Sequence, residues 1–189
     1  MAVLPIYVYD QAVLKRRAKP VQKVDETLVR FVEDMFETMR KANGIGLAAN
    51  QVGLLQRVIV IDVSGMEGLE DAKPLTLLNP RIVEEEGDVA MEEGCLSLPD
   101  LRDEVKRPEK VTVEFVDLDL RKQVIEADGI LARALQHEID HLNGVLFIER
   151  LGSVRRKLLR GRLNKILKGE VETNYPIVVS AQTPELHMR

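Results

Sequence analysis

One run of the sequence is typical of a metal site: Gln136-His137-Glu138-Ile139-Asp140-His141. His137 and His141 are four residues apart, so on a helix both imidazoles lie on one face and can bind the same ion. Glu138 follows the first histidine, where its carboxylate can accept a proton from a water that the metal activates. The chain has only three histidines and two belong to this motif, which favours a metal site over a surface helix with incidental histidines.

A tetrahedral catalytic site needs a third protein ligand and an open position. The downstream candidates are Glu149, Glu170, Glu172 and, in an apparent C-terminal tail, His187. The upstream candidate is Cys95, the single cysteine of the chain, which follows Gly94. A lone cysteine is more often a small buried hydrophobe. Two metal-facing histidines, and a glycine that permits close approach of the backbone, favour Cys95 as the ligand.

The segment Gly44-Ile45-Gly46-Leu47-Ala48-Ala49-Asn50-Gln51-Val52-Gly53 combines small residues with a glutamine. It does not match a phosphate-binding loop, because no Lys-Ser or Lys-Thr pair follows the glycines and no strand precedes them. Taken alone, the segment favours a plain turn from helix to strand. The alternative is a backbone that passes close to a ligand, with the Gln51 amide donating to an oxyanion.

Hydrophobic periodicity predicts the elements that position these groups. Helices are expected over 24–42, with Asp25 as N-cap, over 125–142, which carries both histidines, and over 153–167, with Ser153 as N-cap. Extended segments are expected over 57–63, 75–78, 81–86 and 110–118. The order lacks a regular βαβ alternation, so we expect an α+β fold: mixed or antiparallel strands packed around a central metal-binding helix, with a C-terminal helix.

Length and composition indicate a globular protein with one catalytic domain over 1–169 and an extended tail over 170–189. Of the 189 residues, 45% are hydrophobic and 31% charged. The formal net charge of −4 argues against nucleic-acid binding by the whole protein, and no DNA partner is expected. A single cysteine excludes an intrachain disulfide. No signal-peptide pattern and no apolar run of about 20 residues is present, so a cytoplasmic protein without a membrane partner is expected.

Three motifs together resemble the signature motifs of bacterial peptide deformylases, in the same order. They are Gly44-x-Gly-Leu-Ala-Ala-x-Gln51, Glu93-Gly-Cys-Leu-Ser97 and Gln136-His-Glu-x-Asp-His141. Residues 127–133, Leu142-Asn143-Gly144 and the opening Leu4-Pro5-Ile6-Tyr7 are similar as well, so the resemblance covers residues 3–168. Ala12 departs from the pattern, because relatives commonly carry proline there.

The resemblance implies a metal-dependent hydrolase that removes the formyl group from formylmethionine at the start of nascent polypeptides and releases formate. It implies one divalent ion on Cys95, His137 and His141, natively Fe²⁺, for which Ni²⁺, Co²⁺ or Zn²⁺ can substitute. Glu138 is then the general base, and the Gln51 amide and the Leu96 N–H stabilise the oxyanion.

The same resemblance implies a pocket for the methionine side chain. Its lining is expected to be Ile45, Met91, Ile130 and Ala134, with the stem of Arg133 nearby, although Ile130 and Ala134 can equally be core residues. Backbone groups of Gly46, Glu93 and Gly94 are expected to bind an extended peptide. Arg102 is expected to order nearby carboxylates, and Gln136 and Asp140 to lie outside the ligand set.

The last predicted helix is strongly basic and contains no acid. Its positive residues are Arg155, Arg156, Lys157, Arg160, Arg162, Lys165 and Lys168. Its apolar stripe is predicted to be Val154, Leu158, Leu159, Leu163, Ile166 and Leu167. Helix 153–168 is compatible with docking on ribosomal RNA and equally with a solvated helix that closes the core.

Two other functions are compatible with parts of the sequence. A zinc endopeptidase would use His137, His141 and Glu170 as ligands, and its activity would survive Cys95→Ser. A non-catalytic module that holds a metal or associates with the ribosome would keep the fold without needing Glu138 or Gln51. Both of these residues are present, which favours the enzyme.

Overall fold

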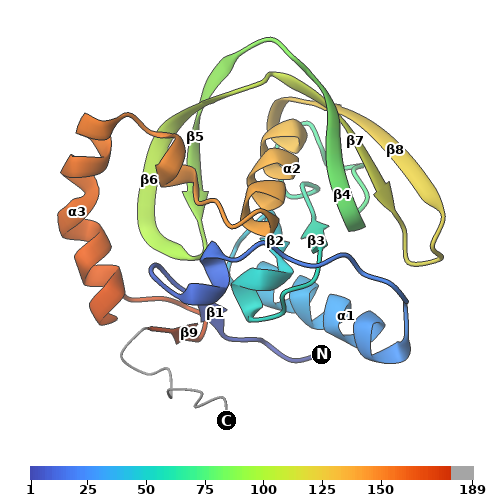
Figure 1. Ribbon diagram of the computed structural model, residues 1–189, viewed down its shortest axis with the longest axis horizontal. Coiled ribbons are helices and arrows are strands. Elements are labelled where there is room, and N and C mark those ends of the chain that lie inside the picture. The colour runs from blue at the N-terminus through green and yellow to red at the C-terminus, as the bar shows by residue number, and fades with distance from the viewer. Residues whose placement is uncertain (180–189) are drawn as a thin grey trace.

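The helix that carries the two histidines lies at the centre of the computed structural model, which describes residues 1–179 (Figure 1). This helix, α2, spans Gly129–Leu142, and each of its residues from 132 to 142 is buried. Both faces of α2 are therefore covered by other elements. The predicted α+β class with a central helix is confirmed.

One face of α2 packs against a five-stranded antiparallel sheet. Its strands are β2 (Gly46–Ala48), β3 (Val58–Ile61), β4 (Leu75–Glu86), β7 (Lys110–Val116) and β8 (Lys122–Asp128), which neighbour one another in this order. The continuous β-branched run of β3 is buried throughout, as a central strand requires. Side chains of the sheet and of α2, such as Ile59, Val113 and Leu135, share one hydrophobic core.

The long β5–β6 hairpin lies beside α2, and two further helices cover the sheet and the hairpin from outside. The hairpin strands are β5 (Val89–Cys95) and β6 (Leu98–Arg107), which curve over the molecule beside α2 (Figure 1). Helix α1 (Glu26–Lys41) packs its apolar side on β2 and β3. The predicted N-cap of α1 is confirmed, because Asp25 Oδ1 accepts a hydrogen bond from Leu28 N at 3.1 Å.

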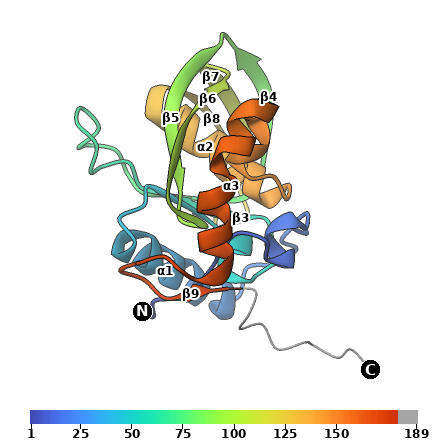
Figure 2. The same cartoon turned by 90° about the vertical axis from the view of Figure 1, so that its left-hand side faces the viewer.

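Helix α3 (Ser153–Lys168) lies along the outside of β6, away from α2 (Figures 1 and 2). Leu159, Leu163 and Ile166 pack into the core that it shares with β6. The predicted apolar stripe is only partly buried, because Val154 and Leu158 are 72% and 70% exposed. The N-cap position is Gly152 and not Ser153.

The chain after α3 returns to the domain instead of leaving it. Strand β9 (Ile177–Val178) pairs in parallel with β1 (Ile6–Tyr7), so the predicted boundary after residue 169 does not end the packed structure. The rest of the predicted tail, residues 180–189, lies outside the described residues. Among residues 1–179, no helix is both long enough and apolar enough to span a membrane.

Two predicted boundaries differ from the structure. Residues 125–128 are the end of β8 and not the start of the histidine helix, because they pair with β7, with Ile125 opposite Val113. The expected break at Asn79-Pro80 is instead an irregularity within the single strand β4, where Asn79 has a φ of 53° and the register with β7 shifts. The β5–β6 hairpin was not expected from hydrophobic periodicity at all.

Candidate metal centre

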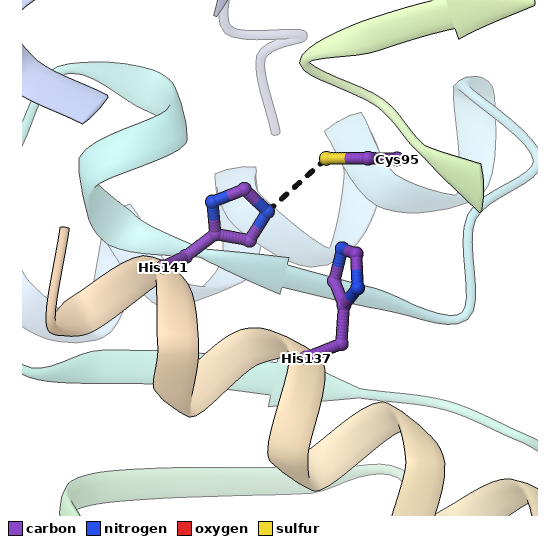
Figure 3. Close-up of side chains that lie close together, drawn as sticks. All are labelled: Cys95, His137 and His141. Carbon is purple, nitrogen blue, oxygen red and sulfur yellow. Dashed lines mark hydrogen bonds between the residues drawn. The ribbon is translucent and has the colours of Figure 1, made fainter. Parts of the chain in front are cut away.

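Three side chains from two elements converge beside α2. Cys95 ends β5, and His137 and His141 project from the same face of α2 toward it (Figure 3). One ligand atom from each lies within 4.8 Å of the other two, and His141 Nε2 is 3.1 Å from Cys95 Sγ. The structure therefore brings together the three residues that were singled out as ligands.

The donor set fits a first-row divalent metal. A thiolate and two imidazoles are suitable ligands for iron, cobalt, nickel or zinc, and three protein ligands leave a fourth position open. Burial and the neighbouring His137 lower the pKa of His141 well below its usual value, which keeps its imidazole neutral, as a ligand must be. Burial also opposes protonation of His137, but hydrogen bonds with Cys95 and Glu93 outweigh it and raise the pKa of His137. A bound cation would replace that proton.

A buried carboxylate fixes the orientation of His137. Glu93 Oε2 lies 2.9 Å from His137 Nδ1, which leaves Nε2 of the ring for a metal. The same carboxylate accepts hydrogen bonds from Arg107 Nε at 2.6 Å and from Arg133 Nη1 at 2.7 Å. Burial alone would raise the pKa of Glu93, but the hydrogen bonds from His137 and Arg107 hold it far below its usual value.

Further polar contacts hold the helix that carries the histidines. Asp140 accepts from Arg107 Nη1 at 2.6 Å and from Arg150 Nε at 2.5 Å. Asn50 Nδ2 donates to the backbone oxygen of His141 at 2.5 Å. Asp140 thus lies outside the ligand set and links α2 to β6 and to the 3₁₀ turn Phe147–Arg150.

Glu138 has the environment of a general base. Its side chain is buried, and its Oε2 has no hydrogen-bond partner among residues 1–179. Loss of hydration on burial raises the pKa of Glu138 to about 7. Glycine at position 46 makes room for this carboxylate, because a Cβ there would lie 2.5 Å from Glu138 Oε1. The need for glycine at position 46, in the first of the three motifs, is therefore explained by its close packing against Glu138 of the third motif.

The Gln51 amide is held beside the cysteine. Its Oε1 accepts from Ala48 N at 2.8 Å, and its Nε2 donates to Ser97 Oγ at 3.2 Å and toward Cys95 Sγ at 3.7 Å. Gly44 packs against Leu96, in the turn that follows Cys95, because a Cβ at position 44 would lie 2.9 Å from Leu96 Cδ1. All three sequence motifs therefore meet at one place.

The expected pocket residues have mixed environments. Ile45 and Ile130 are half-buried and pack against the sheet core, Met91 is half-buried on β5, and Ala134 is buried. The Arg133 guanidinium is held by Glu93 and by the backbone oxygens of Val105 and Val89, so this charged end does not face solvent.

The arginine that orders the carboxylates is Arg107, which sequence reasoning missed. Arg102 does contact a nearby carboxylate, since its Nη1 lies 3.5 Å from Glu92 Oε1, but both side chains are exposed, whereas Arg107 is 2% exposed between Glu93 and Asp140. Arg107 is the last residue of β6, and no local spacing marks it as buried. Gln136, as expected, lies outside the ligand set: its Nε2 donates to the backbone oxygens of Pro108 and Ala132.

The other candidate ligands lie elsewhere. Glu170 is exposed beside Lys168, and Glu149 accepts from Leu146 N at 2.9 Å. Glu172 is exposed, and His187 lies outside the described residues. Within residues 1–179, Cys95 is thus the third donor beside the two histidines.

A half-buried thiol, two buried imidazoles and the buried carboxylate of Glu138 on an α+β scaffold define a candidate metallohydrolase. Residues 3–157 match the model of the polypeptide deformylase family, and the chain belongs to that family of hydrolytic enzymes. It is 46% identical to the peptide deformylase of Salinibacter ruber, over 93% of this chain and 94% of the relative.

Solved structures agree with this family. The crystal structure of a peptide deformylase from Legionella pneumophila has a TM-score of 0.82 and 39% identity, covering 97% of this chain and all of the other. The Ehrlichia chaffeensis peptide deformylase solved in complex with actinonin has a TM-score of 0.81 and 39% identity, covering 91% of this chain and all of the other.

Proposed function

We propose that the protein removes the N-formyl group from formylmethionine at the start of nascent polypeptides, in the cytoplasm, and releases formate. One divalent ion held by Cys95, His137 and His141 would serve the reaction, natively Fe²⁺, with Ni²⁺, Co²⁺ or Zn²⁺ as substitutes. The observation that carries the proposal is the convergence of these three ligand atoms within 4.8 Å. Family membership supports the substrate.

A divalent ion held by Cys95, His137 and His141 would supply Lewis acidity, which would make a water molecule more acidic and polarise the formyl oxygen. Glu138 accepts the proton of the attacking water, because its buried carboxylate has a pKa of about 7 and an oxygen, Oε2, to which no group of residues 1–179 is hydrogen-bonded. The water oxygen forms a bond with the formyl carbon, and the bond from that carbon to nitrogen breaks. Glu138 then passes the proton to the departing amine, so formate and a free amino terminus are the products.

Two donors of this chain are proposed to stabilise the formyl oxygen as it gains negative charge. Gln51 Nε2 carries two hydrogens: one bonds to Ser97 Oγ, and the other, which lies toward Cys95 Sγ at the long distance of 3.7 Å, is proposed to donate to substrate. The Leu96 N–H belongs to the same turn as Cys95. Loss of one such donor costs on the order of 10²-fold in rate.

Specificity is proposed to come from an apolar pocket for the methionine side chain. Ile45, Met91, Ile130 and Ala134 are the proposed lining, with Arg133 nearby. The backbone of Gly46, Glu93 and Gly94 would bind the peptide as an added strand. Their closeness to Glu138 and to the 95–97 turn supports this arrangement.

Product analysis tests the proposed reaction. The protein, purified without oxygen, is incubated with a short formyl-Met peptide and, as control, with the same peptide lacking the formyl group. We expect formate and an intact deformylated peptide from the first and no product from the second. Cys95→Ser should abolish formate release. Cleavage of internal peptide bonds, or full activity of Cys95→Ser, would contradict the proposal and favour an endopeptidase.

Helix α3 is proposed to dock the enzyme on ribosomal RNA. Its seven Lys and Arg residues are exposed on a helix without acids. Arg155 pairs with Asp103 on β6, and Lys168 lies 4.0 Å from Glu170, just after the helix. The N-terminal half of α3 borders a groove that is lined by Lys15, Arg156, Lys157 and Arg160, among others. Such a cluster binds phosphates in a salt-dependent way.

Cosedimentation with bacterial ribosomes tests the docking. We expect binding to weaken as the salt concentration rises from 50 to about 200 mM. The double substitution Arg156→Glu and Arg160→Glu should weaken binding further at each salt concentration. Arg121→Glu together with Lys122→Glu is the control matched in charge, because both residues are exposed and lie at the opposite side of the fold from α3 (Figure 1). Salt-independent binding, or equal loss in the control, would contradict docking through α3.

A further inference from the structure

The described part of the C-terminal segment reaches the 95–97 turn, which carries the cysteine ligand and the Leu96 N–H. The Tyr175 hydroxyl donates a hydrogen bond to the Leu96 backbone oxygen at 2.9 Å. We propose that Tyr175 is a positioning residue, which holds the 95–97 turn so that the Leu96 N–H points at the reacting oxygen. This inference rests on the proposed function, in which Leu96 is an oxyanion donor.

The position of Tyr175 is fixed from both sides along the chain. Gly169 ends α3 in the left-handed region, with a φ of 74°, and so turns the chain back toward the domain. Asn174 Nδ2 then donates to the backbone oxygen of Lys41 at the end of α1. Directly after Tyr175, β9 pairs with β1. The tyrosine is thus held between two anchored points. Both it and Leu96 pack against the hydrophobic core that α1 shares with β2 and β3.

Two further hydrogen bonds hold the far end of the 95–97 turn. Tyr9 N donates to the Ser97 backbone oxygen at 3.0 Å, and Gln51 Nε2 donates to Ser97 Oγ at 3.2 Å. Both bonds fix Ser97, whereas the bond from Tyr175 fixes the carbonyl of Leu96 itself. The orientation of the peptide units on either side of Leu96 therefore depends on the tyrosine hydroxyl, because a carbonyl held in one direction limits rotation of the residue that bears it.

The hydroxyl is suited to a permanent structural bond. Burial, together with the nearby Cys95 and Asp100, raises the pKa of Tyr175, so its proton stays available for donation at neutral pH. Tyr175 lies beyond residue 157, where the match to the family model ends. The contact thus joins a residue beyond that match to Leu96, which lies within it.

The substitution Tyr175→Phe removes the hydroxyl and keeps the ring. Tyr7→Phe is the matched control, because Tyr7 lies on β1, the partner of the strand that follows Tyr175, and its hydroxyl lies beside Gly53. Wild type and both variants are compared for formate release (kcat and KM), bound metal and Tm. Amide hydrogen exchange of the peptide that covers 95–97 reports on the turn without any turnover.

We expect Tyr175→Phe to lower kcat between about twofold and tenfold, as loss of one neutral hydrogen bond implies, with KM unchanged. An oxyanion donor acts in the transition state, so substrate binding should be little affected. Exchange at 95–97 should be faster in Tyr175→Phe than in wild type, with bound metal retained. Tyr7→Phe should match wild type in every measurement.

Three results would overturn the inference. The first is wild-type kcat and wild-type exchange in Tyr175→Phe. The second is a loss of activity that equals the loss of bound metal or is matched by Tyr7→Phe, since either assigns the tyrosine a general role in stability. The third is a higher KM with unchanged kcat. A wild-type protein that releases no formate would instead reject the proposed function, and the exchange experiment would still report whether Tyr175 holds the turn.

Discussion

Arg107 forms a bidentate ion pair with Glu93, in which Nε donates to Oε1 at 2.6 Å and Nη2 donates to Oε2 at 2.9 Å. The two side chains are 1% and 3% exposed. Because Glu93 Oε2 also contacts His137 Nδ1, the orientation of one candidate metal ligand depends on an arginine in another strand.

Replacement of Arg107 by methionine should destabilise the protein strongly. The change leaves the carboxylates of Glu93 and Asp140 buried with fewer partners, which typically costs about 3–5 kcal/mol. For a chain of this size that corresponds to a fall in Tm of roughly 6–20 °C. Arg81→Met is the control, because its pair with Glu114 is exposed and contributes about 0–1 kcal/mol. Equal Tm values for the two variants would contradict the network.

Stability at acid pH should depend on Glu93. Its pKa in the folded protein lies below the usual value of 4.5, so its ionised form contributes stability that is fully present above pH 4.5 and is lost as the pH falls further. Glu93→Gln should be less stable at pH 7 and should lose less stability between pH 5 and 3. Urea unfolding of metal-free protein measures both, without a contribution from metal loss. If the free energy of unfolding fell equally with pH in wild type and in Glu93→Gln, this role of Glu93 would be excluded.

Glu138→Gln should lower kcat by about 10²–10⁴-fold while bound metal stays at the wild-type level, because Glu138 is a base and not a ligand. The same residue predicts the acid limb of the pH profile. Glu138 must be ionised to accept a proton, so activity should fall as the pH drops through the pKa of Glu138. That pKa is about 7 without metal and lower beside a bound cation.

Glu33→Gln, an exposed change of the same kind on α1, is the control for this variant and should keep wild-type kcat. Formate release from pH 5 to 9, with metal content measured on the same samples, gives both results. Normal turnover by Glu138→Gln would show that Glu138 is not the general base.

Gly46→Ala should lower activity without touching a ligand. The added Cβ would lie 2.5 Å from Glu138 Oε1, so the carboxylate must shift. A displacement of about 1 Å can cost on the order of 10²-fold in rate. Gly65→Ala is the matched control, because no described atom lies within 4 Å of its Cβ position. If both variants had equal activity and metal content, Gly46 would have no part in placing Glu138.

The ligand set was readable from the sequence because its parts carry local signals. His137 and His141 are one helical turn apart, and glycines mark the close approaches at Gly44 and Gly46. Helix α1 and strand β3 follow regular apolar patterns, and the structure confirms them within a few residues. Local spacing is sufficient wherever burial follows hydrophobicity.

Burial of charged residues explains most of what the sequence did not reveal. The inward positions of β6 include Asp103 and Arg107, which are buried because they pair with Arg155 and Glu93 on other elements. Hydrophobic alternation cannot detect such a strand. Tyr175 was missed for a related reason, since its contact with Leu96 joins residues that are distant in the chain.

Metal titration of the stripped protein tests the central claim most directly. Protein treated with a chelator and then supplied with Fe²⁺ or Ni²⁺ under anaerobic conditions is assayed for formate release from a formyl-Met peptide. The account predicts no activity in the stripped protein, a linear rise that saturates at one ion per chain, and no recovery in Cys95→Ser under the same conditions. Formate release by fully stripped protein, or saturation at two ions per chain, would contradict it.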